Sequence, residues 1–421
     1  MQLKSFNSKS MTNNKNTLLP NSIFKMLKNE MALELESILN YWIKSTVDNE
    51  NGGFYGRIDG NNELFANNNK ASILNTRILW TFSAAYSLLS DKKYLAIANR
   101  AKSYLIKYFW DNKYGGIFWM LDYKGKPVDR KKQIYAQAFA IYALSEYYKA
   151  TKDSEALEYA IKLFELIEKH SYDQEKDGYF EAYSKDWKLL ADLRLSNKDA
   201  NEKKTMNTHL HVLEAYTNLY RIWPNTVLQN QLKKLIDVFI SKIIDNQTNS
   251  FVLFFDENWN QKSNKTSFGH DIEGSWLLYE AAAVLNNEEL LYKVESIILK
   301  MANQLVLNGI DTDGALVNEA ERGKIFDYDK HWWPQAEAIV GFVNAWQLTK
   351  KESFLKNAVD VWAFTKNKII DKRNGEWYFR VNREGIPYEM EDKVGPWKCP
   401  YHNGRACFEI IERYELIHKN A

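Results

Sequence analysis

The stretch YGGIFWMLDYKGK, residues 114–126, combines paired glycines, alternating aromatic side chains and a Lys-Gly turn, and related stretches recur along the chain. The others open at Asn51 (NGGFYGRIDG), Asp177 (DGYFEAYSKDW), Ser250 (SFVLFFDENWN), Asp313 (DGALVNEAERG) and Asn374 (NGEWYFRVNREG), at successive spacings of 63, 63, 73, 63 and 61 residues. Alternating side chains around Gly, Asp-Gly or Asn-Gly turns are typical of β-hairpins. Six repeats, each beginning with a predicted hairpin, therefore organise the chain.

Two helices are expected in each repeat. The first is rich in Ala, Leu and aromatic residues on nearly all sides, which predicts a buried inner helix; these helices span 73–89, 133–149, 206–221, 270–285, 333–348 and 401–416. The second has charges on one face and apolar residues at i, i+3, i+4 and i+7 on the other, which predicts an outer helix. The outer helices span 94–109, 154–170, 227–244, 287–306, 353–369 and, from the N-terminus, 22–45. Together they predict an all-α fold, an (α/α)6 barrel of six inner and six outer helices with short β-hairpins at one mouth.

Composition narrows the class of protein. The 421 residues carry 56 basic and 54 acidic side chains that are interspersed, so nothing favours a nucleic acid or an anionic membrane as partner. No linker separates the repeats, which predicts one domain over 22–421 behind a flexible polar tail, 1–21. The tail lacks the apolar core of a signal peptide, and the only cysteines are Cys399 and Cys407. We expect a cytoplasmic protein, a monomer or weak homodimer, acting on a neutral small molecule.

Polar residues gather at the starts of the predicted inner helices, where buried charge is otherwise costly. Five of the seven histidines lie there; the exceptions are His170 and His418. The set comprises Arg77, Tyr135, Asn207, His209, His211, His270, Asp271, Glu273, His331, Trp332, Trp333, Glu337, His402 and Arg405. Because every hairpin precedes an inner helix, these side chains are expected to line a cleft at one mouth of the barrel.

Spacing separates some of these candidates. Asn207 and His211 are four residues apart and share a helix face only if His209 points away, so we expect His211 in the cleft. His270 and Glu273, at i and i+3, are close enough for the carboxylate to orient the imidazole, which would suit proton transfer near neutral pH. The alternatives are a buried, hydrogen-bonded core histidine for His211 and a capping or salt-bridge pair for His270 and Glu273.

Two further patterns concern ligands. Cys399, His402 and Cys407 in KCPYHNGRAC offer zinc-type side chains, but their spacing is irregular and a fourth ligand is missing, so no metal site is expected. Trp333 and Trp397 flank polar segments at the mouth, and a flat indole suits the apolar face of a pyranose ring. Sugar stacking and simple core packing both remain open for these tryptophans.

The segments FGHDIEGSWLL, WWPQAEAIVGFVNA, NKASILNTRILW and KVGPWKCPYHNGRACFE resemble the cellobiose 2-epimerases of the N-acylglucosamine 2-epimerase superfamily, over nearly the whole chain from about Glu30. The resemblance implies an (α/α)6 barrel that interconverts glucose and mannose at the reducing end of β-1,4-linked disaccharides such as cellobiose, lactose or mannobiose. It implies no ATP or redox cofactor. A monosaccharide isomerase or an N-acylglucosamine 2-epimerase is the related alternative. An inverting glycoside hydrolase using Glu273 and Glu337 is less favoured.

The resemblance also implies roles for individual residues. His270 and His402 match the acid/base histidines, while Arg77 and His211 match the pair that steadies an enediolate. The substrate-contacting positions that match are Tyr135, Asn207, Glu273, Trp333 and Trp397. The departures are the polar N-terminal tail and His209, which replaces an apolar residue of some relatives.

Overall fold

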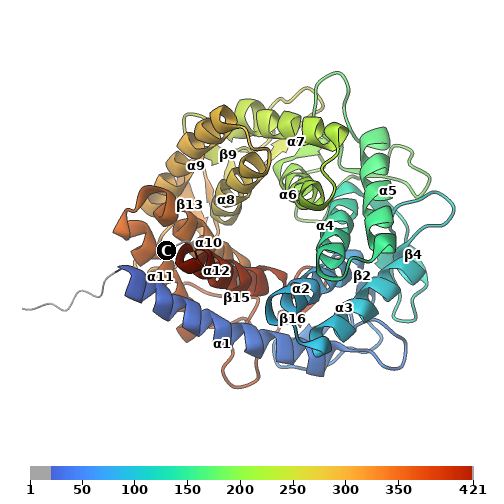
Figure 1. Ribbon diagram of the computed structural model, residues 1–421, viewed down its shortest axis with the longest axis horizontal. Coiled ribbons are helices and arrows are strands. Elements are labelled where there is room, and N and C mark those ends of the chain that lie inside the picture. The colour runs from blue at the N-terminus through green and yellow to red at the C-terminus, as the bar shows by residue number, and fades with distance from the viewer. Residues whose placement is uncertain (1–19, 420–421) are drawn as a thin grey trace, which may run out of the picture.

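The computed structural model describes residues 20–419, and in this part of the chain twelve α-helices alternate between an inner and an outer ring (Figure 1). The inner helices are α2 (Ser72–Leu89), α4 (Ile134–Thr151), α6 (Met206–Ile222), α8 (Phe268–Val284), α10 (Trp332–Thr349) and α12 (Tyr401–Lys419). The outer helices are α1 (Pro20–Thr46), α3 (Lys92–Tyr104), α5 (Ser154–His170), α7 (Thr226–Val238), α9 (Glu288–Asn308) and α11 (Glu352–Phe364). The predicted (α/α)6 barrel is confirmed. The predicted tail lies, up to residue 19, outside the described residues.

The two helix classes differ in what they bury. The inner helix α4 is buried continuously from Ile134 to Tyr147, as its Ala- and aromatic-rich sequence requires. The outer helix α5 buries a single stripe and keeps its charges in water; the stripe is Ala156, Ala160, Leu163, Phe164 and Ile167. Asp153 caps α5 by accepting a hydrogen bond from Ala156 N at 3.1 Å. Single π-helical turns extend three outer helices: η1 (Leu105–Phe109), η2 (Phe239–Ile243) and η3 (Thr365–Ile369).

Short strands link neighbouring repeats at one end of the barrel. The strand before each inner helix pairs with a strand that follows the next outer helix. The antiparallel pairs are β2 (Lys70–Ala71) with β3 (Met120–Leu121), β5 (Lys132–Gln133) with β6 (Ala182–Tyr183), β7 (Lys204–Thr205) with β10 (Phe254–Phe255), β11 (Lys265–Ser267) with β12 (Glu319–Glu321), and β14 (Lys330–His331) with β15 (Arg380–Val381). Finally β16 (Asp392–Val394) pairs with β1 (Ile58–Asp59) and closes the ring.

The hairpins predicted within repeats are mostly single bridges, such as Ile58 with Leu64. The remaining strands are β4 (Pro127–Asp129), β8 (Ile244–Asp245), β9 (Ser250–Phe251) and β13 (Lys324–Asp327), of which β4 extends β3, β8 pairs with β9, and β13 extends β12. Strand pairing between neighbouring repeats, more than pairing within one repeat, therefore holds the strands at the mouth of the barrel in place.

Buried ion pairs hold five of these strands. Each pair joins a fully buried lysine to an aspartate of the preceding turn; four of the lysines stand two residues before an inner helix, and Lys393 lies in β16. The N–O distances are 2.7 Å for Lys70–Asp48, 2.9 Å for Lys132–Asp111, 2.7 Å for Lys204–Asp173, 2.7 Å for Lys330–Asp311 and 2.6 Å for Lys393–Asp371. A buried ammonium requires such a partner. In the fourth repeat Thr266 takes the lysine position, and Asp245 accepts from Thr248 Oγ1 instead.

Within residues 20–419, no helix combines the length and the apolar character needed to cross a membrane.

Candidate active site at the hairpin mouth

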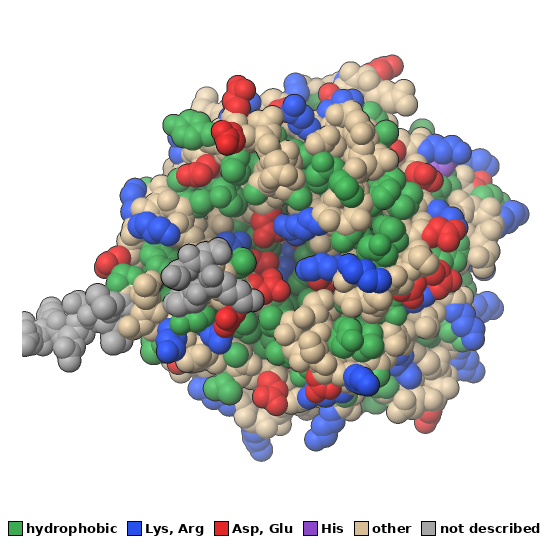
Figure 2. Space-filling model, viewed as in Figure 1, with side chains coloured by type: hydrophobic (Ala, Val, Ile, Leu, Met, Phe, Trp, Pro, Cys, Tyr) green, Lys and Arg blue, Asp and Glu red, His purple; other side chains and the backbone are tan. Residues whose placement is uncertain are grey.

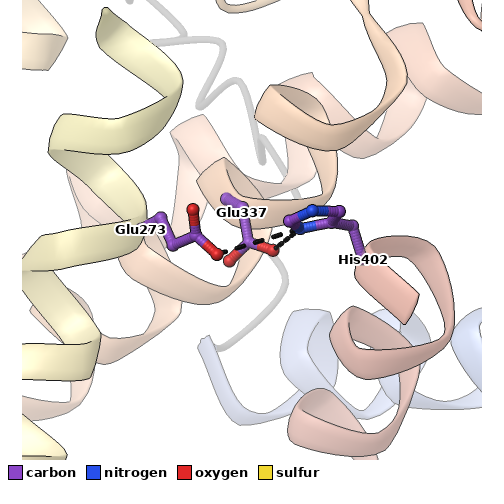
Figure 3. A group of neighbouring side chains, drawn as sticks. All are labelled: Glu273, Glu337 and His402. Atoms are coloured by element: carbon purple, nitrogen blue, oxygen red, sulfur yellow. Dashed lines mark hydrogen bonds and ion pairs between the residues drawn. The ribbon is translucent and has the colours of Figure 1, made fainter. Parts of the chain in front are cut away.

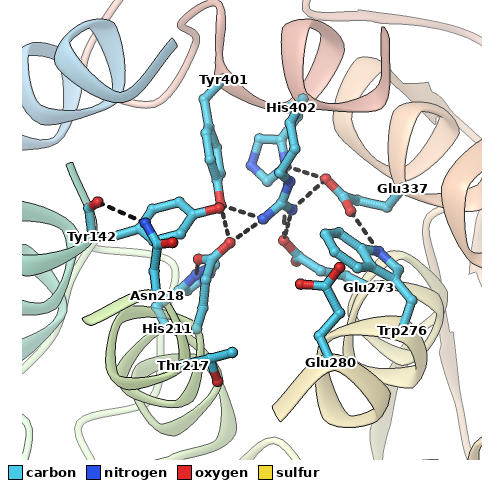
Figure 4. A network of polar contacts seen from close by, with 12 residues as sticks. Tyr142, His211, Thr217, Asn218, Glu273, Trp276, Glu280, Glu337, Tyr401 and His402 are labelled. Atoms are coloured by element: carbon cyan, nitrogen blue, oxygen red, sulfur yellow. Dashed lines mark hydrogen bonds and ion pairs between the residues drawn. The ribbon is translucent and has the colours of Figure 1, made fainter. Parts of the chain in front are cut away.

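A cluster of charged side chains crosses the barrel axis below the hairpin mouth. The Arg405 guanidinium on α12 donates through Nη2 to Glu273 Oε1 at 2.6 Å and to Glu337 Oε1 at 2.7 Å. Its Nη1 contacts Glu214 Oε1 on α6. Figure 4 shows this network between helices, with Tyr401 and Trp276 at its edges. We call Arg405, Glu214, Glu273 and Glu337 the central ion-pair layer.

His402 stands on this layer. Its Nδ1 lies 2.7 Å from Glu337 Oε1 and 3.9 Å from Glu273 Oε1 (Figure 3). Burial, followed by the positive charges of Arg77 and Arg405, holds the pKa of His402 well below its ordinary value, so the ring is neutral at physiological pH. Since a carboxylate accepts the Nδ1 proton, Nε2 is left with a free lone pair.

His270 is anchored in the same way but by a different partner than expected. Ser267 Oγ lies 2.7 Å from His270 Nδ1. The expected pairing with Glu273 is wrong, because the Glu273 carboxylate is held by Arg405 from across the barrel. Burial lowers the pKa of His270 to about 3, which makes this ring neutral as well. Within residues 20–419, Nε2 of His270 and Nε2 of His402 form no hydrogen bond to the protein.

The Trp333 ring lies close to both histidines. Its ring centroid is 4.6 Å from that of His270 and 5.6 Å from that of His402. Trp333 and His270 are half-buried, so this part of the mouth is reached by solvent. Gly269 makes the arrangement possible, because a Cβ at that position would lie 2.5 Å from Trp333 Cη2.

The other side of the mouth carries Arg77 and His211. Arg77 Nη2 donates to the Tyr135 hydroxyl at 2.8 Å, and Arg77 Nη1 to the Trp397 carbonyl oxygen at 3.3 Å. The His211 ring packs edge-on against Tyr135 at 4.8 Å, and its Nδ1 lies 2.9 Å from Glu214 Oε2. The Trp397 ring is 6.0 Å from that of Tyr135. The structure thus brings together every predicted residue of this group.

The two histidines of α6 have separate surroundings, as the spacing predicts. His209 Nδ1 lies 2.6 Å from the Thr205 carbonyl oxygen, and its Nε2 accepts from Tyr179 N at 2.9 Å, so both ring nitrogens serve the fold. Gly178 permits this contact, since a Cβ there would lie 2.7 Å from His209 Nε2. Asn207 is half-buried one turn before His211 on α6, and its buried Oδ1 has no hydrogen-bond partner among residues 20–419.

Charge is unevenly divided within the central ion-pair layer. Burial opposes ionisation of Glu214, yet the charge of Arg405 and the contact with His211 lower its pKa to about 2. Burial and the neighbouring charge of Glu337 instead raise the pKa of Glu273 well above its ordinary value. Burial raises the pKa of Glu337 as well, so both carboxyl groups bound by Arg405 Nη2 resist ionisation more than Glu214 does. Oε2 of Glu273 is buried and has no partner in the described part of the chain.

Within residues 20–419, one group of side chains brings possible metal-ligand atoms together: the ligand atoms of Glu273, Glu337 and His402 lie within 4.8 Å of one another. Arg405 already places its guanidinium between the two carboxylates, which explains their approach. The cysteines face elsewhere: Cys399 Sγ is 3.8 Å from Arg77 Nη1, and Cys407 Sγ is 3.7 Å from Met31 Sδ. The side chains therefore fit an ion-pair layer better than a metal centre.

Sequence reasoning overlooked Glu214 and Tyr401 and gave no contact to Glu337 or Arg405. A signal was present, because four inner helices carry a charged or imidazole side chain as their sixth residue, namely Arg77, His211, Glu273 and Glu337, and α12 carries Arg405 as its fifth. The fourth residue of an inner helix is also polar in several repeats. In α10 this residue is Gln335, whose side-chain oxygen accepts a hydrogen bond from Leu316 N in the preceding turn at 2.8 Å.

Comparisons with known proteins agree with this geometry. Residues 53–406 match the family model "N-acylglucosamine 2-epimerase (GlcNAc 2-epimerase)". A cellobiose 2-epimerase of Bacteroides fragilis is 50% identical over 390 residues, covering 92% of this chain and 99% of the relative, and one of Ruminococcus albus is 42% identical with the same coverage. The solved cellobiose 2-epimerase of Bacillus thermoamylovorans superposes with a TM-score of 0.88 at 44% identity, over 92% of this chain and all of that one.

More distant structures share the fold alone. A D-mannose isomerase superposes with a TM-score of 0.81 at 22% identity, over 94% of this chain, and a family 76 α-mannanase with 0.64 at 14%, over 96%. The family match and the two sequence relatives cover most of the chain, including the histidines, the central ion-pair layer and both mouth tryptophans. The chain belongs to the N-acylglucosamine 2-epimerase family, and within it is similar to the cellobiose 2-epimerases.

Proposed function

We propose that the protein is a cellobiose 2-epimerase, which reversibly epimerises C2 of the reducing-end glucose or mannose in β-1,4-linked disaccharides such as cellobiose, lactose or mannobiose. One observation carries the proposal: two neutral imidazoles, His270 and His402, both lie close to the Trp333 indole, and each is anchored through Nδ1 with Nε2 left for a ligand. Removal and return of a carbon-bound proton on two faces needs two such bases.

The reaction requires an open-chain sugar, because the C2 proton is acidic only beside a C1 carbonyl. We assign to His270 the proton transfers at O1 and the ring oxygen that open the ring. His402 Nε2 then takes the C2 proton, and the C–H electron pair passes into a cis-enediolate. The negative enediolate raises the proton affinity of His270, which draws a proton from solvent at the half-open mouth. After rotation about C2–C3, His270 gives that proton to the other face of C2, and solvent exchange resets both rings.

The neighbouring residues stabilise the developing negative charge and bind the sugar. Arg77 donates to the developing oxyanion, a form of preorganised stabilisation that often dominates catalysis. His211 joins it as an imidazolium: its Nδ1 proton is held by the ionised Glu214 carboxylate, so Nε2 donates once the negative enediolate has drawn a proton to it. Trp333 and Trp397 stack on the sugar rings, while Tyr135 and Asn207 bind hydroxyls; the unpartnered Oδ1 of Asn207 is available for this. Glu273 acts through Arg405, which it contacts, so we assign it a positioning role in place of the catalytic one.

The geometry disfavours an inverting glycoside hydrolase. That mechanism needs carboxylates about 6.5–9.5 Å apart with room for a water. A carboxyl oxygen of Glu273 and one of Glu337 lie within 4.8 Å of each other, and Arg405 forms an ion pair with both residues.

Incubation with cellobiose in D₂O, followed by proton NMR, tests the function. The expected product has a reducing-end mannose with deuterium at C2, formed without ATP, and EDTA leaves the rate unchanged. Turnover of mannose or N-acetylglucosamine with inert cellobiose would assign the monosaccharide isomerase or N-acylglucosamine epimerase activity. Release of free glucose would instead support a hydrolase.

Substitution tests the two histidines. His270→Ala and His402→Ala are each expected to abolish turnover while sugar binding is largely kept. His170→Ala is the matched control, since His170 lies on outer helix α5 and stacks on Trp187 at 4.6 Å. Substantial activity in either mouth variant would remove that residue from the acid/base pair.

We further propose that the protein is cytoplasmic, that its binding partner is the disaccharide substrate, and that it works without a cofactor.

A further inference from the structure

A second cavity opens at the other end of the barrel, at the C-terminal ends of the inner helices. Its volume is about 670 Å³, which is within the range of small-molecule sites. Figure 2 looks onto this end and shows acidic and basic side chains around a central hollow. Neither His270 nor His402 lines it, so it is separate from the candidate active site.

The charged side chains of this cavity are largely paired with one another. Arg221 lies 2.9 Å from Glu280, Arg413 2.9 Å from Glu409, and Lys149 3.0 Å from Glu146. Glu412 adds one more carboxyl group, so the lining holds four acidic and three basic side chains. Burial together with the charge of Glu280 raises the pKa of Glu409 to about 7. An anion or cation would have to compete with existing ion pairs, whereas hydroxyl groups can hydrogen-bond to charged groups that stay paired.

The inner wall of the cavity is aromatic. The rings of Trp80 and Tyr142 stack at 5.2 Å with an interplanar angle of 14°, and Trp276 and Phe408 complete the wall. Aromatic surface beside hydrogen-bonding groups is the combination that binds the apolar faces and hydroxyl edges of sugars. The four carboxylates of the cavity do not converge as a metal site does, since among residues 20–419 the only such group is Glu273, Glu337 and His402.

Trp276 separates the two ends of the barrel. It lines the cavity, while its Nε1 donates to Glu337 Oε2 at 3.1 Å and the Arg405 guanidinium lies 4.7 Å from its ring. The central ion-pair layer therefore forms the far side of this wall. We propose that the cavity is a second binding site, for a neutral mono- or disaccharide or sugar alcohol, independent of the reaction at the hairpin mouth.

Ala283→Trp tests the site, because Ala283 lines the cavity and an indole there would fill it. Ala150→Trp is the matched control: Ala150 is also half-buried near the end of an inner helix but does not line the cavity. Equilibrium dialysis with labelled cellobiitol, which lacks the carbonyl needed for epimerisation, counts bound ligand. At saturation we expect two molecules of cellobiitol per chain for the unsubstituted protein and for Ala150→Trp, but one for Ala283→Trp. The rate of deuterium incorporation at C2 of cellobiose should agree within twofold among the three proteins.

The proposal would be overturned if the unsubstituted protein bound only one molecule per chain, or if Ala283→Trp bound as many molecules as the unsubstituted protein. Spermidine, a polyamine cation, serves as a second probe. If Ala283→Trp lost spermidine binding while its cellobiitol binding stayed unchanged, the cavity would be a cation site and the proposal would be overturned. Should Ala283→Trp fail to fold, crystals of the unsubstituted chain soaked in cellobiitol decide the matter. Density for a sugar beside Trp276 supports the proposal, and a cavity holding only water overturns it.

Discussion

His402 Nδ1 and Glu337 Oε1 lie 2.7 Å apart, although the two residues come from different inner helices, α12 and α10. Because the carboxylate accepts the Nδ1 proton, this contact selects the tautomer whose Nε2 can act as a base. Glu337 is itself held by Arg405 and by Trp276 Nε1. The orientation of the proposed base thus depends on three helices.

Glu337→Gln should lower kcat by about 10- to 100-fold, the usual cost of losing a group that orients a functional histidine. Sugar affinity should change little, because Glu337 lies behind His402. Deuterium incorporation at C2 gives kcat, and a binding titration gives the affinity. Glu158→Gln, on an exposed side chain of α5, is the control for removing a carboxylate. An unchanged kcat would show that His402 needs no partner at Nδ1.

The pH dependence of kcat/KM follows from the lowered histidine pKa values. Burial lowers the pKa of His270 to about 3 and, with Arg77 and Arg405, that of His402 well below 6.5. A base is lost only as the pH falls through its pKa in the free enzyme. The acid limb of kcat/KM should therefore lie well below pH 6.5, with circular dichroism at each pH to separate unfolding. An acid limb at or above pH 6.5 would contradict the neutral pair.

Gly269→Ala should weaken sugar binding more than it slows chemistry. The added Cβ would approach Trp333 Cη2 to 2.5 Å and displace the indole that packs near both histidines. We expect KM to rise several-fold and kcat to fall less. Gly341→Ala provides the matched control, since its Cβ would meet Ile272 Cγ1 at the same 2.5 Å, two turns further along α10 from Trp333. Equal KM changes in both variants would make the effect a general loss of packing.

Lys393→Met should destabilise the fold strongly. Lys393 is fully buried and lies 2.6 Å from Asp371, so its removal leaves a buried carboxylate without its cation, at a cost of about 3–5 kcal/mol. Thermal unfolding measures the loss. Lys162→Met breaks an exposed pair with Glu158 and should cost less than about 1 kcal/mol. The double variant Lys393→Met/Asp371→Asn should recover part of the stability, and no recovery would mean that the lysine stem matters more than its charge.

Much of the fold could be predicted from the sequence because it repeats. Each inner helix was placed within about two residues of its observed start, since Ala- and aromatic-rich segments and turn residues mark its ends. The strand pairs were not predicted in their true form. Local turn chemistry indicates hairpins within a repeat, whereas partners such as Lys132 and Tyr183 are set by packing between repeats.

The site was predictable where one helix decides it. Helical spacing correctly separated His211 from His209, because residues two apart on a helix face different neighbours. The same reasoning failed for His270 and Glu273. Spacing shows that two side chains can meet, but not that Arg405, 132 positions away, competes for the carboxylate. Glu214 was missed for the same reason, since its contact with Arg405 spans 191 positions.

The pairing of β16 with β1 has a consequence for synthesis of the protein. Arg57 Nε and Asp392 Oδ1, 2.9 Å apart at this junction, are separated by 335 positions of sequence. On the ribosome, the first repeat therefore emerges long before its neighbour in the closed ring exists. Until then the nascent chain is an open arc whose β1 edge has unpaired backbone groups. The ring can close only after β16 has been synthesised, when the sixth repeat pairs with the first.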